Sequence, residues 1–305
     1  MTLESIKTVA VLGAGTMGNG IAHVFARAGY NVILRDVQEG FLQRGMETIG
    51  KNLDREVKKG KLAEAEKPQV LARLKPVTDF AAVAASDFVV EAVPEKLEIK
   101  RAVLTEADKL LRPEVILTSN TSSIAITTLA AMTKRPDRFV GMHFMNPVPV
   151  MALVEVIRAL QTSDAAFATT MELAKKLGKT PVAVNDAPGF VSNRVLMPLI
   201  NEAAYTVMEG VATPEAVDTV MKLGMNHPMG PLELADFIGL DVCVDIMHVL
   251  LDGLGDPKYR ACPLLKKYVA AGWLGRKSGR GFHQYAKDVP GVAPGTGSGN
   301  VEERR

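Results

Sequence analysis

Residues 7–18, KTVAVLGAGTMG, combine a short apolar run with three closely spaced glycines. The apolar run from Val9 to Leu12 predicts a short strand, and the helical segment after the glycines ends at Gly29. The residues between them, Gly13, Ala14, Gly15, Thr16, Met17 and Gly18, form a GxGxxG pattern. That pattern is weak alone, but a strand before it and a helix after it are the context of a dinucleotide-binding turn.

Each glycine of the turn has a physical task. Gly13 permits the tight turn, Gly15 lets the backbone approach a pyrophosphate, and Gly18 lets helix and strand pack closely. The free N–H groups at the start of the helix face the anion. We therefore expect all six residues of the turn to contact the cofactor; a flavin dinucleotide and a turn without ligand are the alternatives.

Asp36 predicts which dinucleotide binds. It ends the second strand-like run, residues 31–35, where a carboxylate accepts hydrogen bonds from the adenosine ribose and repels a 2′-phosphate. Arg35 beside it would favour the phosphate, but neighbouring side chains in a strand point to opposite faces. The expected cofactor is NAD rather than NADP.

The remaining pattern predicts an α/β fold with a doubly wound, mostly parallel sheet of Rossmann type. Continuous apolar runs recur between helical lengths, at residues 88–90, 115–117, 139–142, 153–157 and 181–184. Such runs are typical of parallel strands covered on both faces. One insertion interrupts them, because residues 39–74 carry a helical stripe at steps of three and four and no strand. We expect a helical hairpin there.

The chain changes character after Asp186. From Val195 to Val207 apolar residues recur at steps of four, and the pattern stays helical to Tyr285. We therefore predict a dinucleotide-binding domain over residues 1–186 and an all-helical C-terminal domain over residues 187–285. Residues 286–305, rich in Gly, Pro and charge, are predicted to be a disordered tail.

Composition excludes several classes of partner. A net charge of +2 is too small for nucleic-acid binding through bulk charge. No apolar run reaches the roughly 18 residues of a membrane helix, and the start lacks a secretion or transit signal. Cys243 and Cys262 form no CxxC or metal-ligand cluster, so we predict no metal. A soluble protein of the reducing cytoplasm is expected.

Two residues suggest acid/base chemistry. His143 ends a strand within GMHFMNP, at the sheet edge where doubly wound folds bind ligands. Glu155 follows in the apolar run LVEVI, where an unpaired carboxylate is costly to bury. A carboxylate paired to an imidazole fixes its tautomer and stabilises its protonated form. The alternative is a structural histidine and a surface glutamate on an edge strand.

Four motifs occur in order: SNTSS (119–123), HFMNPVP (143–149), LVEV (153–156) and DAPGFVSNR (186–194). Together they resemble the 3-hydroxyacyl-CoA dehydrogenase family, including its bacterial 3-hydroxybutyryl-CoA dehydrogenases, from about Lys7 to Tyr285. The resemblance implies that His143 is the acid/base and that Glu155 holds it. It also implies that Ser122 and Asn193 hydrogen-bond the reacting oxygen, although each residue alone would also fit a helix cap.

The resemblance assigns further residues to the ligands. Glu95, Lys100 and Asn146 correspond to family residues near the nicotinamide half of NAD; an ordinary solvated helix face is the alternative for Lys100. The hairpin carries a basic cluster, Lys51, Arg55, Lys58, Lys59 and Lys61. Charge runs are usually solvated, but family members contact coenzyme A from this hairpin, and we expect Asn52 and Lys59 to do so.

The function that the resemblance implies is NAD-dependent interconversion of a short (S)-3-hydroxyacyl-CoA and its 3-ketoacyl-CoA. GPLELAD (230–236) resembles the family's helical domain, which implies a homodimer through that domain. Two alternatives stay open: a non-catalytic NAD-binding structural protein of the same family, and a related 3-hydroxyacid dehydrogenase. The latter would carry a lysine near Asn193, whose neighbours here are Ser192 and Arg194. Met145 and His227 are unusual for the family, and no role is predicted for either.

Overall fold

The structure, a computed structural model, describes residues 2–285. The predicted tail, residues 286–305, lies outside the described residues. The chain divides into two compact units, one ending at Phe190 and the other beginning at Val191. This division falls four residues after the boundary that the sequence predicted at 186/187. Each unit is described by itself.

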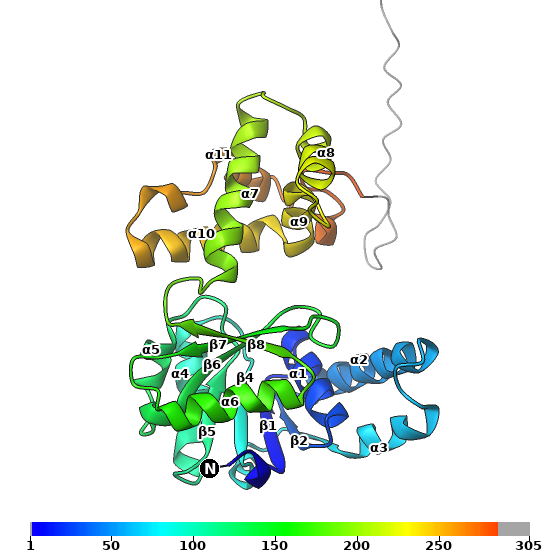
Figure 1. Cartoon of the computed structure of the whole chain (residues 1–305), viewed down its shortest axis with the longest axis vertical. Coiled ribbons are helices and arrows are strands. Elements are labelled where there is room, and N and C mark those ends of the chain that lie inside the picture. The colour runs from blue at the N-terminus through cyan, green and yellow to red at the C-terminus, as the bar shows by residue number, and fades with distance from the viewer. Residues whose placement is uncertain (1, 286–305) are drawn as a thin grey trace, which may run out of the picture. The chain divides into compact units, whose positions relative to one another are not determined.

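The first unit is built on one eight-stranded sheet with the order β3-β2-β1-β4-β5-β6-β7-β8 (Figure 1). The strands are β1 (Thr8–Leu12), β2 (Asn31–Arg35), β3 (Leu74–Val77), β4 (Phe88–Glu91), β5 (Ile116–Ser119), β6 (Phe139–Phe144), β7 (Leu153–Arg158) and β8 (Thr180–Asn185). All neighbours are parallel except β6 and β7. Those two are antiparallel because their connection is too short for the crossover that parallel strands require.

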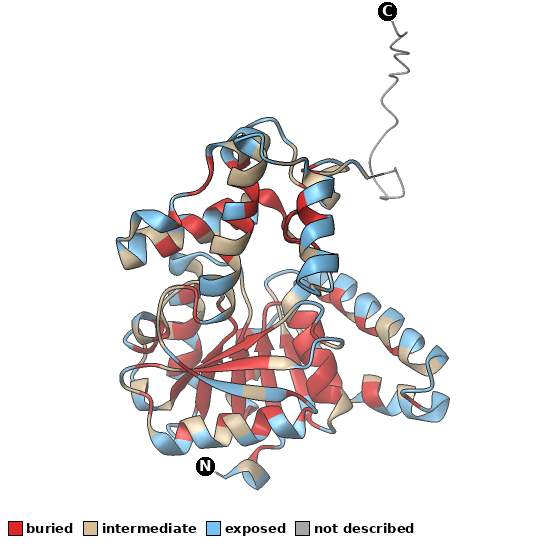
Figure 2. Ribbon diagram, turned by 45° about the horizontal axis from the view of Figure 1, so that its top comes forward, coloured by how far each residue is buried: buried red, intermediate tan, exposed pale blue. Residues whose placement is uncertain are grey.

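Side chains that alternate along the strands contribute to two hydrophobic cores. In β1, Val9 and Val11 pack into one core, whereas Ala10 and Leu12 pack into the other. Side chains of a strand alternate between faces, so the two cores cover opposite sides of the sheet. The central strands are consequently buried along their length, as their red colour in Figure 2 shows. The predicted doubly wound, Rossmann-type sheet is confirmed.

Helices cover both faces. One core includes side chains of α1 (Thr16–Arg27), α2 (Glu39–Lys58), α3 (Lys67–Ala72) and α6 (Asp164–Lys176). The other includes side chains of α4 (Leu97–Leu110), α5 (Ile126–Ala130) and the 3₁₀ segment η3 (Phe80–Ala85). Further short 3₁₀ segments are η1 (Leu3–Ser5), η2 (Glu64–Glu66) and η4 (Pro136–Arg138). The outer faces of the longer helices carry exposed residues (Figure 2).

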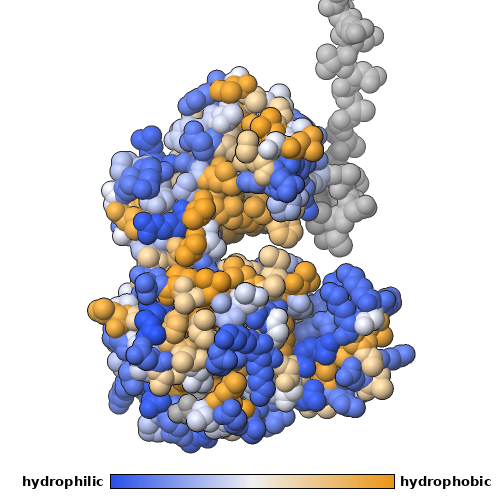
Figure 3. All heavy atoms as spheres, viewed as in Figure 1, coloured by the Kyte–Doolittle hydropathy of each residue, from blue (hydrophilic) through white to orange (hydrophobic). Residues whose placement is uncertain are grey.

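The predicted helical hairpin is formed by α2, η2 and α3. Leu42, Ile49 and Leu53 are buried along one side of α2, which accounts for the apolar stripe in the sequence. The helix ends at Lys58, and Gly60 then adopts a left-handed conformation with φ 65°. In the view of Figure 3 the hairpin presents a mostly hydrophilic surface.

The second unit is helical. Its helices are α7 (Ser192–Met208), α8 (Pro214–Gly224), α9 (Pro231–Ile238), α10 (Leu240–Leu254) and α11 (Pro263–Ala270), with 3₁₀ segments η5 (Pro257–Tyr259) and η6 (Arg276–Ser278). They share one core that includes Met197, Leu232 and Met247. Both cysteines are buried free thiols, and burial raises the pKa of Cys243 to about 12. None of the helices in residues 2–285 is both long and apolar enough to cross a membrane.

Two buried aspartates link segments of the second unit that lie far apart in the sequence. Asp218 in α8 accepts hydrogen bonds from the N–H groups of Leu232 and Glu233, each at 2.9 Å, in the first turn of α9. Asp236 accepts from the N–H groups of Phe282 and His283 at 3.0 and 2.9 Å. Because both carboxylates collect backbone donors from distant segments, they bind α8, α9 and the segment before Tyr285 together.

Candidate active site

The glycine turn between β1 and α1 is held by contacts that leave no room for side chains at two positions. Gly13 has φ 105°, and a Cβ there would lie 2.5 Å from the carbonyl oxygen of Ala92. A Cβ on Gly18 would lie 1.8 Å from the carbonyl oxygen of Gly13. At Gly15, in contrast, a Cβ would have nothing within 4 Å. The space beside Gly15 is therefore open to a ligand, as a pyrophosphate site at the start of α1 requires.

Asp36 lies beside this turn. Its carboxylate accepts hydrogen bonds from the N–H groups of Ala14 and Val37, both at 2.7 Å. The Arg35 guanidinium instead lies over the ring of Phe80, 4.4 Å from its centroid. Phe80 belongs to the core on the opposite face of the sheet from Val9 and Val11. Arg35 is thus engaged away from the ribose position, as strand alternation predicts.

His143 and Glu155 meet across the antiparallel strands β6 and β7, where they are directly paired. The distance from His143 Nδ1 to Glu155 Oε2 is 2.8 Å. Only 6% of His143 and 2% of Glu155 is exposed. An imidazole N–H that donates to a buried carboxylate leaves Nε2 with a lone pair, which is the form of a general base. The alternative of a surface glutamate on an edge strand is wrong, because Glu155 is buried and β7 lies between β6 and β8 in the sheet.

Ser122 lies against the other ring nitrogen. Its Oγ is 2.9 Å from His143 Nε2, so serine, imidazole and carboxylate form one hydrogen-bonded row. The residue does not cap the following helix, because Ala125 is the N-cap of α5. The row ends at the carboxyl end of β5 and β6, the edge of the sheet at which the glycine turn follows β1.

Glu95 binds the segment that carries Ser122. Its Oε1 accepts from the N–H groups of Ser122 and Ser123, each at 3.0 Å, and from the Thr121 hydroxyl. Burial opposes ionisation of Glu95, but the charge of Lys100 and the hydroxyl donors outweigh it and hold its pKa below the ordinary value. Lys100 Nζ lies 3.2 Å from Glu95 Oε2. Lys100 is only 1% exposed, so the interpretation as a solvated helix face is wrong.

Three further residues that the sequence analysis did not identify hydrogen-bond with Lys100, with Glu95 or with each other. Glu91 at the end of β4 is fully buried and pairs with Lys100 Nζ at 2.8 Å. Ser119 Oγ donates to Glu91 Oε2 at 2.5 Å, and Thr121 Oγ1 accepts from the N–H of Ile124 at 3.0 Å. The signal for Glu91 was present, since it is a carboxylate that ends the apolar run FVVE, as Glu155 sits within LVEVI.

Four other predicted residues lie on three separate segments, namely the β6–β7 connection, the helical hairpin and α7. Asn146 is exposed in the β6–β7 connection, next to the cis peptide bond to Pro147. Asn52 lies on α2 and accepts from Arg55 Nη1 at 3.0 Å, whereas Lys59 is exposed just after that helix. Asn193 lies in the first turn of α7, in the second unit.

The β6–β7 connection is held in place by Lys179 and by α1. Lys179, which precedes β8 and is mostly buried, donates from Nζ to the carbonyl oxygens of Val148 and Met151 at 2.5 and 2.7 Å. Burial lowers the pKa of Lys179. The connection also packs on α1, because a Cβ on Gly20 would lie 2.8 Å from Val148 Cβ. The backbone that carries Asn146 is therefore anchored at two points.

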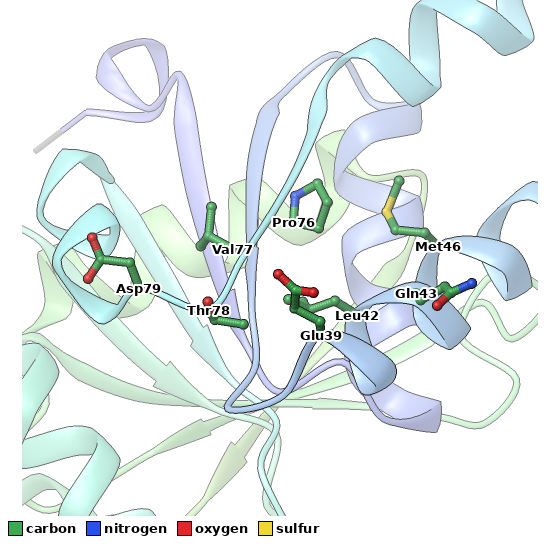
Figure 4. Close-up of a pocket in the computed structure, with 8 residues that line it drawn as sticks. All are labelled: Glu39, Leu42, Gln43, Met46, Pro76, Val77, Thr78 and Asp79. Atoms are coloured by element: carbon green, nitrogen blue, oxygen red, sulfur yellow. The ribbon is translucent and has the colours of Figure 1, made fainter.

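A separate cavity of about 480 Å³ lies between α2 and the end of β3. Figure 4 shows its lining, in which Leu42, Met46 and Pro76 supply apolar atoms and Glu39 contributes a carboxylate. None of its lining residues belongs to the glycine turn, to the His143–Glu155 pair or to the Ser122 segment. The cavity adjoins Asp36 instead, because the Asp36 N–H donates to the carbonyl oxygen of Val77, one of its lining residues, at 3.2 Å.

Two family models cover most of the chain. The family model described as "3-hydroxyacyl-CoA dehydrogenase, NAD binding domain" matches residues 8–187, and the corresponding C-terminal domain matches residues 189–285. The chain belongs to the 3-hydroxyacyl-CoA dehydrogenase family. It is therefore an NAD-dependent enzyme, and its first unit is the NAD-binding domain of that family.

Relatives of this dehydrogenase cover nearly its whole length. A probable 3-hydroxybutyryl-CoA dehydrogenase of Bacillus subtilis is 56% identical over 280 residues, 92% of this chain and 98% of the relative. Another, of Deinococcus radiodurans, is 58% identical over 275 residues, 90% of this chain and 99% of the relative. The crystal structure of (S)-3-hydroxybutyryl-CoA dehydrogenase from Ralstonia eutropha matches with a TM-score of 0.90 and 53% identity, covering 93% of this chain and 100% of that one.

Proposed function

We propose that this enzyme interconverts a short-chain (S)-3-hydroxyacyl-CoA, such as 3-hydroxybutyryl-CoA, and the matching 3-ketoacyl-CoA. The observation that carries the proposal is the buried His143–Glu155 pair at 2.8 Å, with Nε2 of the imidazole directed at the Ser122 hydroxyl. The names of the relatives support the substrate class, since those in Bacillus subtilis and Deinococcus radiodurans are both termed 3-hydroxybutyryl-CoA dehydrogenases.

Oxidation of an alcohol to a ketone removes a hydride from carbon and a proton from oxygen. Bound NAD supplies the hydride acceptor. In the proposed reaction His143 Nε2 takes the proton of the 3-hydroxyl as the hydride leaves C3, and the carbonyl forms. Glu155 stabilises the imidazolium that results, because a carboxylate beside a buried imidazole favours the charged form. In the reverse direction the same imidazolium returns the proton to the oxygen.

Hydrogen-bond donors at the reacting oxygen complete the proposal. The Ser122 hydroxyl lies 2.9 Å from His143 Nε2, so it adjoins the place where the 3-hydroxyl must sit. Ser122 and Asn193 are assigned to stabilise that oxygen as it gains negative charge. Asn193 lies in the first turn of α7 in the helical unit, and its assignment rests on its match to the family motif.

Other residues are assigned to the two ligands. The six residues of the glycine turn and Asp36 would hold the pyrophosphate and adenosine ribose of NAD, and Glu95, Lys100 and Asn146 would lie near its nicotinamide half. Asn52 and Lys59 on the hairpin would contact coenzyme A, whose phosphates suit a basic surface. We further propose that the enzyme acts in the cytoplasm as a homodimer through its helical unit. Exposed apolar side chains on that unit, such as Val195 and Leu223, support the dimer.

An absorbance assay tests the proposed function. Purified enzyme with acetoacetyl-CoA and NADH should consume NADH, and acyl-CoA substrates of increasing length should define the preferred chain. A non-catalytic structural relative would bind NADH without consuming it. A related 3-hydroxyacid dehydrogenase would act on the free acids rather than on the thioesters. Either result would overturn the proposal.

A further inference from the structure

Glu91 is a buried carboxylate that the proposed reaction does not use. It ends β4, where its neighbours in register are Leu12 of β1 and Ser119 of β5, and none of its surface is exposed. Burying an unpaired charge is costly, and here three donors surround the group. The Val93 N–H and Lys100 Nζ lie 2.8 Å from Oε1, and the Ser119 hydroxyl lies 2.5 Å from Oε2. Burial raises the pKa of Glu91 against the opposing charge of Lys100.

Lys100 joins this carboxylate to a second one. Its ammonium lies 2.8 Å from Glu91 Oε1 and 3.2 Å from Glu95 Oε2, and it donates to the Val93 carbonyl oxygen at 3.3 Å. Lys100 itself is in the first turn of α4 and has almost no contact with solvent. The position of the ammonium is therefore set jointly by Glu91 from the sheet and by Glu95 from the loop before α4.

Glu95 connects Lys100 to the hydrogen-bonded row of Ser122, His143 and Glu155. Its Oε1 holds the N–H groups of Ser122 and Ser123 and also accepts from the Ser123 hydroxyl at 2.9 Å. Ser122 Oγ in turn lies 2.9 Å from His143 Nε2. Hydrogen bonds and ion pairs thus run without interruption from Glu91 through Lys100 and Glu95 to the Ser122 segment.

We propose that Glu91 is a positioning residue for the reaction: through Lys100 and Glu95 it fixes the backbone of Ser122 and so places the Ser122 hydroxyl against His143. This inference rests on the proposed function, because it assigns Ser122 to the reacting oxygen. The hydrogen bonds and the ion pair of Glu91 go to Val93, Lys100 and Ser119 and do not include the imidazole. Glu91 acts on catalysis only through the segment that Glu95 holds.

A double-mutant cycle between Glu91→Gln and Ser122→Ala tests the inference in the full-length enzyme. Glu91→Gln keeps the shape of the side chain but weakens its hold on Lys100. In the wild-type background it should lower kcat for acetoacetyl-CoA reduction at least about tenfold. The NADH dissociation constant should rise less than about threefold, because Lys100 and Glu95 are assigned only to the nicotinamide half of NAD. In the Ser122→Ala background Glu91→Gln should lower kcat less than about twofold, because the group it positions is gone.

Two results would overturn the inference. If Glu91→Gln lowers kcat by the same factor in both backgrounds, its effect does not pass through Ser122. If the NADH dissociation constant rises by as large a factor as kcat falls, the effect lies at the cofactor. Glu91→Asp, which keeps the charge but withdraws it from Lys100, goes through the same cycle if Glu91→Gln does not yield folded protein. Wild-type turnover is measured first, so that failure of the proposed function is recognised separately.

Asp87→Asn is the matched control. Asp87 stands at the opposite end of β4 and, like Glu91, accepts from backbone N–H groups and pairs with a cation, Arg112. Its variant should lower the melting temperature while kcat stays within about twofold of wild type. A comparable loss of kcat in Asp87→Asn would mean that any destabilisation of β4 slows the reaction. That result would contradict the inference.

Discussion

His143 and Glu155 are directly opposed residues of β6 and β7, and their Nδ1 and Oε2 atoms lie 2.8 Å apart. In antiparallel strands, directly opposed side chains lie on the same face of the sheet. The backbone register alone therefore brings the imidazole and the carboxylate close together. Because both residues are nearly fully buried, the carboxylate has no solvent to compete with the imidazole. This geometry leads to the first prediction.

His143→Gln should lower kcat by about 10²- to 10⁴-fold, the usual contribution of a general acid/base, while NADH binding stays nearly intact. Glu155→Gln should lower kcat by a similar order, because the amide neither fixes the tautomer nor stabilises the imidazolium. Steady-state rates with acetoacetyl-CoA and fluorescence titration with NADH measure both effects. Near-normal turnover of His143→Gln would remove the proposed mechanism.

Cofactor preference should depend on Asp36. The wild-type enzyme should use NADH in preference to NADPH, since a carboxylate at the ribose repels the 2′-phosphate. Asp36→Ser should reduce that preference at least about tenfold by removing the repulsion. The ratio of kcat/KM for the two cofactors checks this. Arg35→Ala serves as the control: its guanidinium lies over Phe80, so the ratio should hardly move.

Gly15 and Gly18 should respond differently to an added methyl group. A Cβ at Gly15 meets nothing within 4 Å, so Gly15→Ala should fold with an unchanged melting temperature. It should nevertheless weaken NADH binding at least about tenfold, because the methyl group occupies the approach of the pyrophosphate. A Cβ at Gly18 would lie 1.8 Å from the Gly13 carbonyl oxygen, so Gly18→Ala should lose stability. Calorimetry and NADH titration distinguish them, and unaltered NADH affinity of Gly15→Ala would place the pyrophosphate elsewhere.

Lys59→Ala should raise KM for acetoacetyl-CoA about two- to fivefold without changing kcat, as expected for one exposed ion pair. The difference from wild type should shrink as salt screens the pair. Lys109→Ala, an exposed lysine in the last turn of α4, is the control and should leave KM unchanged. Equal KM values for the Lys59→Ala variant and the wild-type enzyme at low salt would show that coenzyme A does not contact Lys59.

Asp87 should make stability depend on pH. Burial opposes its ionisation, but N–H groups of Thr8 and Lys7 and the Arg112 guanidinium outweigh burial and hold its pKa below the ordinary 3.8. A depressed carboxyl pKa stabilises the folded state above the unfolded value, and that stabilisation is lost as pH falls through the folded value.

Accordingly, Asp87→Asn should lower the free energy of unfolding by about 1–3 kcal/mol at neutral pH. The difference from wild type should begin to shrink near pH 3.8 and should disappear only when the pH is below the lowered pKa of Asp87 in the folded protein. Urea unfolding across this range measures it, and a difference that persists unchanged in acid would contradict the assignment.

Local patterns were enough for the strands and for the glycine turn. Each apolar run is a strand because buried parallel strands need apolar side chains on both faces, and the turn needs glycine where a Cβ would strike the backbone. The His143–Glu155 pair was also within reach, because a carboxylate inside an apolar strand must find a partner. The same reasoning applied to Glu91 would have predicted a buried partner for it, although not which one.

Neighbours along the chain and short motifs were sufficient to predict most strands, the glycine turn and NAD as the cofactor, and to propose His143 and Glu155 as an acid/base pair. Only the tertiary structure decided that Lys100 is buried between two carboxylates and that Glu95 holds the Ser122 backbone. Those contacts join β4, β5 and the loop before α4. Their distances depend on how the parallel strands align and on how α4 packs against them, and no local pattern of side chains encodes either.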